Sequence, residues 1–280
     1  MSSLVEQGRW RAIDVGGAQL DLWESGPESD KPPVVLIGTA LTADELLPVA
    51  RLLASDLGRT VLAYRRRGYG TAGTVAGAGS IRLDASDLIA LLDELEIACA
   101  VVVGVSYSGA VALQAAADHP ERVERVIAIE PPPVQSASAA AFRVANTRLI
   151  AEYEHLGAPR AADRFLSRLM DPHWRLDVER MLPGAVAQVD ADAETFFAAD
   201  IPALLSWDFT EADAAKVTAP VLLVSGTASA HWFEEEIEAI RTWFTNVSHV
   251  SLANADHSMA LTHPTEVESA VAGFIRDASA

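Results

Sequence analysis

The chain has 280 residues, half of them apolar, and a formal net charge of −18 at pH 7. This length can bury a full hydrophobic core, whereas so acidic a surface repels nucleic acid and anionic membranes, and neither is expected as a partner. No apolar run approaches the roughly 18 residues that cross a bilayer, and residues 1–10 lack the pattern of a secretory signal. The single cysteine, Cys99, excludes an internal disulfide and a cysteine-based zinc site. These features predict a cytoplasmic protein.

Strand and helix patterns alternate along the first 130 residues. Two strands, 11–15 and 19–23, flank Gly16 and Gly17 and predict an opening hairpin. After them, short apolar runs alternate with segments of helical spacing, which predict strands 34–37, 60–64, 100–104 and 123–129 and helices 43–57, 83–95 and 109–117. Buried strands separated by helices predict a parallel sheet covered by helices on both faces.

The alternation stops between residues 134 and 218, where helical patterns dominate. It then resumes, with strands 221–225 and 247–253 and helices 233–244 and 264–276. Ligands of α/β sheets bind at the carboxyl ends of the strands, and a helical insert lying there forms a cap. We therefore predict an α/β core with a mostly parallel sheet of about eight strands and helices on both faces. The core comprises residues 1–133 and 217–280, and the helical cap residues 134–216.

The stretch 101–109, VVVGVSYSG, places a lone serine between an apolar strand and a helix. This pattern is typical of the sharp turn that exposes a nucleophilic hydroxyl, here that of Ser106. The turn brings together the residues two before and two after the serine, so both must be small, and they are Gly104 and Ser108. Ser108 replaces the commoner glycine. Because such short patterns also arise by chance, the hypothesis depends on partners further along the chain.

A serine hydroxyl needs a base, usually a histidine that a third group orients. Of the seven histidines, His257 falls in the loop between the last strand and the last helix. In a parallel sheet this loop opens on the same edge as the turn at Ser106, and we predict that His257 is the base. Because the imidazole must be neutral to accept a proton, activity is expected to fall below about pH 6.5.

The third member should be a carboxylate at a strand end on the same edge, between the serine and the histidine in chain order. The usual position, after strand 221–225, holds Ser229, and no acid occurs from residue 214 to 233. Glu130 instead follows strand 123–129, and three prolines behind it stiffen the chain. We favour Glu130 as the acid over three alternatives, Asp208, Asp213 and Asp256.

Two donors must meet the oxyanion that forms when the hydroxyl attacks a carbonyl carbon. One is predicted to be the backbone N–H of Tyr107, which directly follows the nucleophile. The other is expected from the loop after strand 34–37. The N–H of Ala40 fits best, and Thr39 and Leu41 are alternatives.

The cap is expected to line an apolar pocket for a small-molecule substrate. Trp207 and Trp232 are the candidates for contact with that substrate. The sequence contains no metal-ligand cluster and no phosphate-binding loop, so neither a metal nor a cofactor is expected. It indicates no oligomeric state.

The chain resembles an α/β-hydrolase over essentially its whole length. The motifs that carry the likeness are VVLIGTAL, AYRRRGYG, VVGVSYSGAVALQAA and the NADH loop that ends at His257. It also resembles a bacterial branch with glycine before the oxyanion loop, Glu-Pro-Pro after the sixth strand and no aspartate after the seventh. Gly38, Glu130 and Ser229 match these traits. An acid after the sixth strand is also similar to some haloalkane dehalogenases and to zearalenone-type lactonases.

Three positions depart from these relatives. A dehalogenase or an epoxide hydrolase would need aspartate at position 106, so Ser106 argues against both. Arg65 replaces an aspartate that is common in the branch, and Val105 replaces a frequent histidine. We predict a serine hydrolase that cleaves an ester or lactone through an acyl-enzyme. The alternatives are a cofactor-free lyase or perhydrolase on the same fold and a ligand-binding protein with little turnover.

Overall fold

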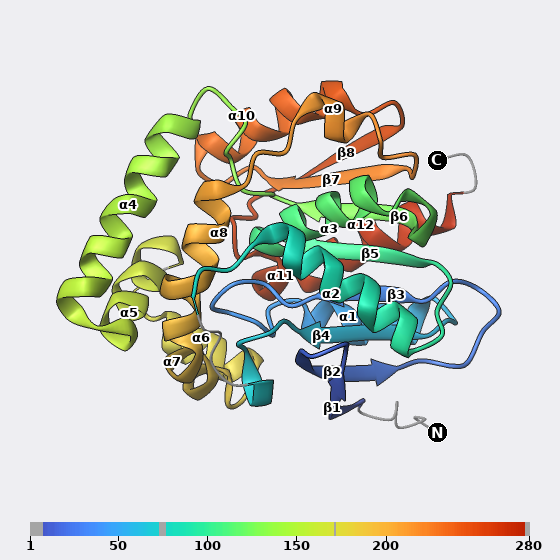
Figure 1. Cartoon of the computed structure of the whole chain (residues 1–280), viewed down its shortest axis with the longest axis horizontal. Coiled ribbons are helices and arrows are strands. Elements are labelled where there is room, and N and C mark those ends of the chain that lie inside the picture. Colours follow the sequence, from blue (N-terminus) through green and yellow to red (C-terminus); the bar gives the residue numbers. More distant parts are fainter. Residues whose placement is uncertain (1–7, 73–76, 171, 278–280) are drawn as a thin grey trace.

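The computed structural model describes residues 8–72, 77–170 and 172–277, so that residues 1–7, which carry most of the argument about a secretory signal, lie outside it. An eight-stranded sheet in the order β1-β2-β4-β3-β5-β6-β7-β8 runs through the molecule (Figure 1). Its strands are β1 (Arg9–Asp14), β2 (Gln19–Ser25), β3 (Val34–Ile37), β4 (Val61–Arg65), β5 (Ala100–Val105), β6 (Val123–Ile129), β7 (Val221–Gly226) and β8 (Val247–Leu252).

The direction of the strands follows the predicted pattern. β1 and β2 form the opening hairpin, and β2 also runs antiparallel to β4. From β4 onward every neighbouring pair is parallel. The mostly parallel sheet is therefore confirmed, and its strand ends gather the loops that follow β3, β5, β6, β7 and β8 at one edge.

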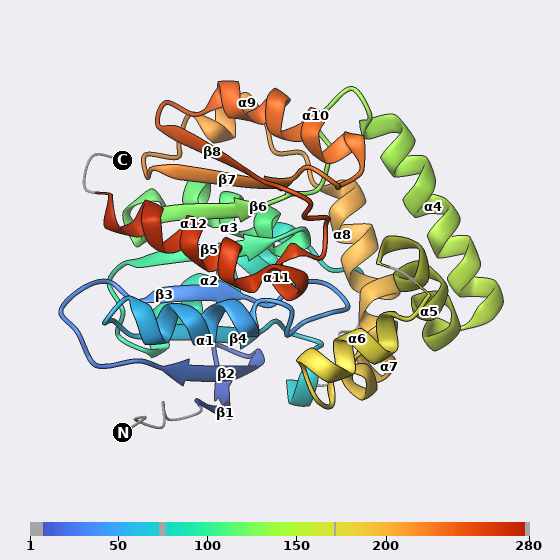
Figure 2. The same cartoon turned by 180° about the vertical axis from the view of Figure 1, so that it is seen from behind.

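Helices cover both faces of the sheet, as the apolar strands require. α2 (Ile81–Glu94), α3 (Tyr107–Asp118) and α10 (His231–Ile240) cover the face seen in Figure 1. Figure 2 shows the opposite face, covered by α1 (Leu47–Asp56), α11 (Met259–Thr262) and α12 (Pro264–Arg276). β5 supplies both layers, because Val101, Val103 and Val105 pack on one side and Ala100 and Val102 on the other.

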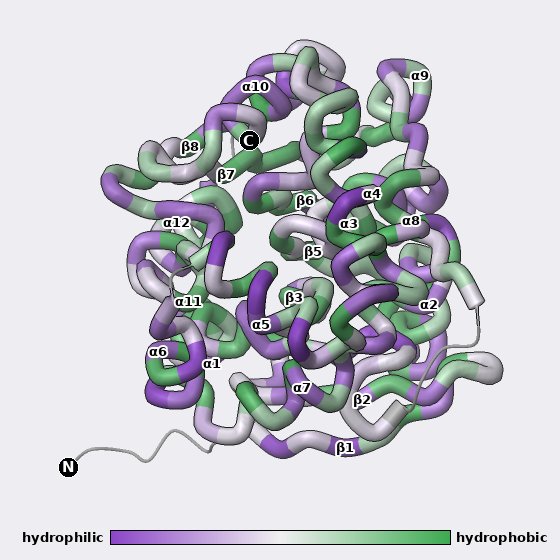
Figure 3. The backbone as a smooth tube through the Cα atoms, turned by 90° about the vertical axis from the view of Figure 1, so that its left-hand side faces the viewer, coloured by the Kyte–Doolittle hydropathy of each residue, from purple (hydrophilic) through white to green (hydrophobic). Residues whose placement is uncertain are grey.

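Between β6 and β7 the described secondary-structure elements are all helices. The elements are α4 (Ala139–Leu156), α5 (Ala158–Leu169), α6 (Trp174–Met181), α7 (Ala185–Thr195), a π-helical turn Phe196–Asp200, α8 (Ile201–Ser206) and α9 (Glu211–Ala214). α4 to α8 gather beyond the carboxyl ends of the strands (Figures 1 and 2). Seen from that end in Figure 3, they have mixed hydropathy and lie in front of mostly hydrophobic strands.

Several predicted elements begin or end at other residues in the structure. The first helix begins at Leu47 rather than residue 43, since Pro48 suits a first helical turn, where its missing N–H breaks no bond. α9 packs on α3 of the core rather than with α4 to α8. The division into core and cap at residues 133 and 216 stays a prediction.

Within the described residues, no helix has both the length and the apolarity needed to cross a membrane.

The connection from β5 to α3 is a sharp turn centred on Ser106. Ser106 has φ 50° and ψ −120°, a conformation that L residues rarely adopt and that the surrounding structure must hold. A Cβ on Gly104 would lie 2.1 Å from the Ser108 carbonyl oxygen, so that position requires glycine. Ser108 fits because its hydroxyl accepts from Val105 N–H at 2.9 Å and donates to Val105 O at 3.0 Å. The side chain of Ser108 therefore connects the turn to the end of β5.

We expect Gly104→Ala to lower the free energy of unfolding by about 1–3 kcal/mol or more, because the added methyl group meets backbone atoms that cannot move aside. Gly273→Ala is the matched control. A Cβ there meets nothing within 4 Å and the residue lies inside α12, so this variant should gain about 0.5–1 kcal/mol. Urea denaturation of the two variants and the wild type measures both effects. Equal stability of Gly104→Ala and the wild type would contradict the turn geometry.

Candidate active site

A large cavity lies between the core and the cap helices. Its volume is about 760 Å³, within the range of small-molecule sites. The loops after β3, β5 and β8 supply one wall, and α4, α5 and α8 supply much of the other. Ser106 and His257 both line this cavity. The cavity therefore brings together two residues that lie 151 positions apart in the chain (257 − 106).

Glu130 and His257 form a part-buried hydrogen bond at the edge of the cavity. His257 Nδ1 lies 2.7 Å from Glu130 Oε2. The other carboxylate oxygen accepts from the Gly226 N–H at 2.8 Å, so both oxygens are held. Glu130 is fully buried and has φ 41°, which directs the residue off the tip of β6 towards the loop after β8. The ring of Phe233 stacks on the imidazole at 4.1 Å between centroids.

The surroundings of His257 control its protonation. Burial acts to lower the pKa of the imidazole, but the hydrogen bond to Glu130 and the charges of Glu130, Glu45 and Asp256 outweigh burial. The pKa of His257 is therefore raised above 6.5. The pH below which this imidazole is protonated accordingly lies higher than the value expected from the sequence.

Ser106 and His257 line the same cavity, but in the described part of the chain no hydrogen bond joins them. The hydrogen bonds of the described residues do not include one between Ser106 Oγ and His257 Nε2. In unliganded enzymes such bonds are often long and tighten only when the substrate binds. With Nδ1 on Glu130, Nε2 is the nitrogen left to face the hydroxyl.

The other acids considered from the sequence lie elsewhere or have other partners. Asp208 is exposed. Asp213 completes the capping box of α9 with Thr210 and pairs with Lys216. Asp256 lines the cavity, but its Oδ1 accepts from the Ser258 N–H at 2.9 Å. Among these carboxylates only Glu130 is hydrogen-bonded to the imidazole.

The loop after β3 offers a backbone donor to the cavity. Leu41 N–H is already committed, since it donates to Tyr69 Oη at 2.9 Å. Thr39 is held by its side chain, whose hydroxyl donates to Val105 O at 2.9 Å. Ala40 lines the cavity beside Tyr107, the first residue of α3. An N–H at a helix start has no partner within the helix, so Tyr107 N–H is available to a ligand.

A buried arginine supports this loop from behind. Arg66 Nε donates to Gly38 O at 2.9 Å, and the guanidinium lies 4.1 Å from the centre of the Tyr107 ring. It also pairs with Asp84 of α2 at 2.9 Å and with Asp200 of the cap at 2.8 Å. One cation thus contacts the loop after β3, the start of α3 and the cap.

Two tyrosines extend this network. Tyr107 Oη donates to Asp84 at 2.8 Å, and Tyr69 Oη donates to Asp200 while accepting from Leu41 N–H. Burial raises the pKa of Asp84 to about 6 although Arg66 acts in the opposite direction. The network joins the cap to the loop that carries Ala40.

Comparison with known proteins assigns the fold to a family. A model of the alpha/beta hydrolase family matches residues 17–270. The chain belongs to the α/β hydrolase family. Structures with the same fold include an enol-lactonase from Burkholderia xenovorans LB400, with a TM-score of 0.76 and 23% identity over 95% of this chain and 100% of that one.

Two further structures share the fold at similar scores. A thermophilic esterase from Thermogutta terrifontis has a TM-score of 0.76 and 20% identity, over 96% of this chain and 98% of that one. A bromoperoxidase from Bacillus anthracis has a TM-score of 0.77 and 19% identity, over 96% of this chain and 100% of that one. At these identities the likeness establishes the α/β hydrolase fold and no more.

Two tryptophans were predicted to contact substrate, and the structure separates them. Trp232 lines the cavity and meets Phe142 of α4 edge to face at 5.6 Å. Trp207 is not among the cavity residues. It is buried against the core, where its indole N–H donates to Gln114 of α3 at 3.0 Å. The chain turns inward at the end of α8, which the sequence pattern does not reveal.

Sequence reasoning missed three residues that shape this hydrolase site. They are Phe233 on the imidazole, Arg66 behind the loop after β3, and Glu45, a buried carboxyl group in the cavity wall. The basic run 65–67 after β4 was a visible signal for Arg66. In the described part of the chain, no group of three or more His, Cys, Asp or Glu side chains is placed to hold a metal ion.

We expect NMR titration to give His257 a pKa above 6.5 in the wild type and a lower pKa in Glu130→Gln. That substitution removes the charge and hydrogen bond that raise the pKa and leaves the opposing burial in place. His249 is the internal control, since burial lowers its pKa below 6.5 and Glu130 does not act on it. An unchanged pKa of His257 in the variant would refute the assignment of its partner.

Proposed function

We propose that this protein is a serine hydrolase that cleaves a carboxylic ester or lactone of a small molecule. The observation that carries the proposal is the hydrogen bond from His257 to the buried Glu130, 2.7 Å long, at the edge of the cavity that Ser106 also lines. Nucleophilic acyl transfer requires a serine, a carboxylate and a histidine, which stand in this order along the chain. The enol-lactonase and the esterase that share the fold support this substrate class.

The reaction begins with proton transfer from the serine. Glu130 accepts from Nδ1 of His257, so the lone pair stays on Nε2 and can take the proton of the Ser106 hydroxyl. Ser106 Oγ then bonds to the carbonyl carbon of the substrate, and the carbonyl π electrons move to the oxygen. Glu130 stabilises the imidazolium that forms.

Two backbone donors stabilise the resulting oxyanion. The proposed donors are the N–H groups of Ala40 and Tyr107, two residues that line the cavity together with Ser106, whereas the N–H of Leu41 donates to Tyr69. Each such donor contributes about 2.7–4 kcal/mol to lowering the barrier in a known serine protease. Arg66 fixes both donors, since it holds Gly38 O on one side and the Tyr107 ring on the other.

The reaction then proceeds in two stages. The first tetrahedral intermediate collapses when His257 gives its proton to the leaving oxygen and the C–O bond breaks, so that the acyl group remains on Ser106. A water molecule next loses a proton to His257 and attacks the acyl carbon; this second intermediate collapses when the acyl–Oγ bond breaks and His257 returns the proton to Ser106, which releases the acid. In a lactone the alcohol and the acid belong to one product. The cavity wall beside Trp232 and Phe142 is the proposed contact surface for the apolar part of the substrate.

The rival interpretations differ in what they release. A perhydrolase transfers the acyl group to peroxide, and a lyase cleaves without net uptake of water. The likeness to a bromoperoxidase concerns the fold alone. A ligand-binding protein was considered because no acid follows β7, but Glu130 lies where that acid is needed. Release of acid and alcohol in peroxide-free buffer distinguishes the hydrolase from all three.

We expect Ser106→Ala to lower kcat/KM for simple aryl esters at least about 10³-fold, because no other group can form the acyl-enzyme. A fluorophosphonate should label the wild type once, on Ser106, and leave the variant unlabelled by mass spectrometry. Ser86→Ala is the matched control, since the Ser86 hydroxyl bonds only to Arg82 O on α2. Full esterase activity of Ser106→Ala would end the proposal.

We expect Tyr69→Phe to lower kcat about tenfold with little change in KM. The variant frees Leu41 N–H and removes a donor from Asp200, so the loop that presents Ala40 loses its support. The inhibition constant of a trifluoromethyl ketone, which mimics the oxyanion, should rise by the same factor. Tyr153→Phe is the control, because the Tyr153 hydroxyl donates to Glu194 on the cap. A loss confined to KM would contradict this positioning role.

A further inference from the structure

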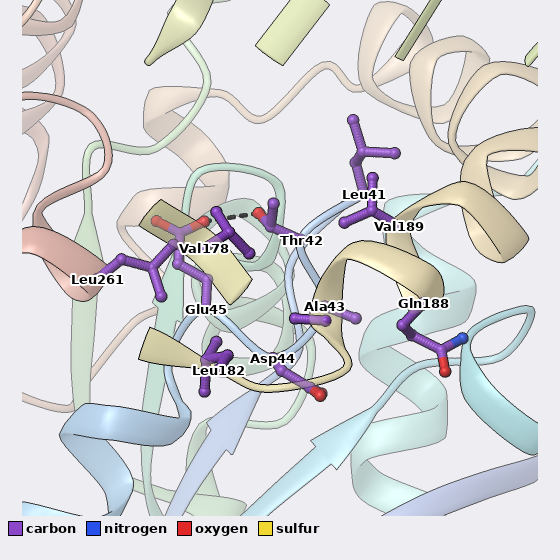
Figure 4. A pocket seen from close by; sticks show the side chains of 11 residues that line it. Leu41, Thr42, Ala43, Asp44, Glu45, Val178, Leu182, Gln188, Val189 and Leu261 are labelled. Atoms are coloured by element: carbon purple, nitrogen blue, oxygen red, sulfur yellow. Dashed lines mark hydrogen bonds between the residues drawn. The ribbon is translucent and has the colours of Figure 1, made fainter. Parts of the chain in front are cut away.

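The wall of the cavity contains a carboxyl group that the proposed mechanism does not use. Glu45 belongs to the loop between β3 and α1, and its side chain is buried, with 8% of the residue exposed. It lines the large cavity together with Ser106 and His257. It also borders a small void of about 10 Å³, where its neighbours include Val178, Leu182 and Leu261 (Figure 4).

This carboxyl group is only half satisfied. Oε2 accepts from the Thr42 hydroxyl at 2.8 Å, as the dashed line in Figure 4 marks. Among the described residues Oε1 has no hydrogen-bond partner, and no lysine or arginine forms an ion pair with Glu45. The neighbouring Asp44, by contrast, pairs with Arg65 at 2.6 Å. Burying a carboxylate without a cation costs free energy, so a structural role alone does not account for Glu45.

The charges around Glu45 leave its carboxyl group open to a hydrogen-bond donor of a bound molecule. Burial raises the pKa of Glu45 to about 7, although attraction to His257 and the Thr42 hydrogen bond act to lower it. The arginines of the cavity wall, Arg148 and Arg168, belong to the cap helices α4 and α5. Arg168 is already paired with Glu152 at 2.8 Å. On the side of the serine, the Glu45 carboxyl group is therefore an acceptor that no cation in the described part of the protein pairs with.

We propose that Glu45 forms a recognition subsite for a hydroxyl or ammonium group of the substrate, beside the ester or lactone carbonyl. This proposal rests on the proposed hydrolase function. The substrate donor would bond to Oε1, while Thr42 holds Oε2 in place. A cationic group would in addition offset the cost of burying the carboxylate. A substrate carboxylate at the same place would meet a like charge and be rejected.

Two series of matched esters test the subsite. One consists of phenyl acetates with an aminomethyl, hydroxymethyl, ethyl or carboxyl group on the ring, in the meta and para positions. The other consists of phenyl esters of benzoic acids with the same substituents, so that both sides of the scissile bond are probed. The assay is run at pH 8.5, above the pKa of about 7 for Glu45. In the series whose substituent reaches the subsite, kcat/KM for the aminomethyl ester should exceed that for the ethyl ester at least about tenfold.

Variants separate charge from hydrogen bonding. Glu45→Gln keeps an acceptor oxygen, so it should lose the preference for ammonium and retain part of that for hydroxyl. Glu45→Leu should lose both. Glu266→Gln makes the same chemical change at an exposed position of α12, outside the lining of the cavity, and should keep the wild-type ratios within about twofold. Equal ratios in wild type and Glu45→Gln, across both series, would overturn the proposal.

A binding measurement keeps the subsite separate from turnover. Calorimetry with Ser106→Ala should detect benzylammonium, with benzoate at least about tenfold weaker, and Glu45→Gln in that background should abolish the difference. If esters of both series are hydrolysed without a preference, the subsite fails and the hydrolase stands. If no ester is hydrolysed but benzylammonium binds through Glu45, the hydrolase fails and the subsite stands. Binding that ignores Glu45 refutes the subsite in either case.

Discussion

The hydrogen bond between Glu130 and His257 is the interaction on which the proposed chemistry depends. It joins the tip of β6 to the loop after β8. At the end of β7, the Gly226 N–H donates to the second oxygen of the same carboxylate. Glycine is required at 226, because a Cβ there would lie 2.1 Å from the Ala255 carbonyl oxygen. A buried carboxylate satisfied on both oxygens holds the imidazole in one tautomer, and any proton transfer at Nε2 follows from that.

A second buried network holds the other half of the site. Arg66 carries one positive charge between Asp84 of the core and Asp200 of the cap, and it contacts Gly38 O in the loop after β3. Removing Arg66 would leave two buried carboxyl groups without a cation, so the cluster depends on this arginine. Asp200, in the π-helical turn before α8, is therefore linked through Arg66 to the loop that contains Ala40 and to Tyr107.

Two of the carboxyl groups that act on His257, those of Glu130 and Glu45, have opposite surroundings. Glu130 is surrounded by donors and directed at the imidazole. Glu45 has one hydroxyl donor and lies among apolar side chains, which raises its pKa to about 7. Both charges act on His257 and both raise its pKa. One carboxyl group thus suits a fixed role in proton transfer, whereas the other remains open to a ligand.

The sequence by itself determined the α/β fold, because apolar runs such as 100–104 alternate with segments of helical spacing, a pattern typical of a parallel sheet covered on both faces. It also singled out Ser106, His257 and Glu130, since strand ends of a parallel sheet share one edge and chain order then limits the choice. Only the tertiary structure decided which side chains face the cavity. Trp207 turns into the core and Glu45 into the site because helix packing in the cap and around α1 sets their directions, and no local periodicity encodes that packing.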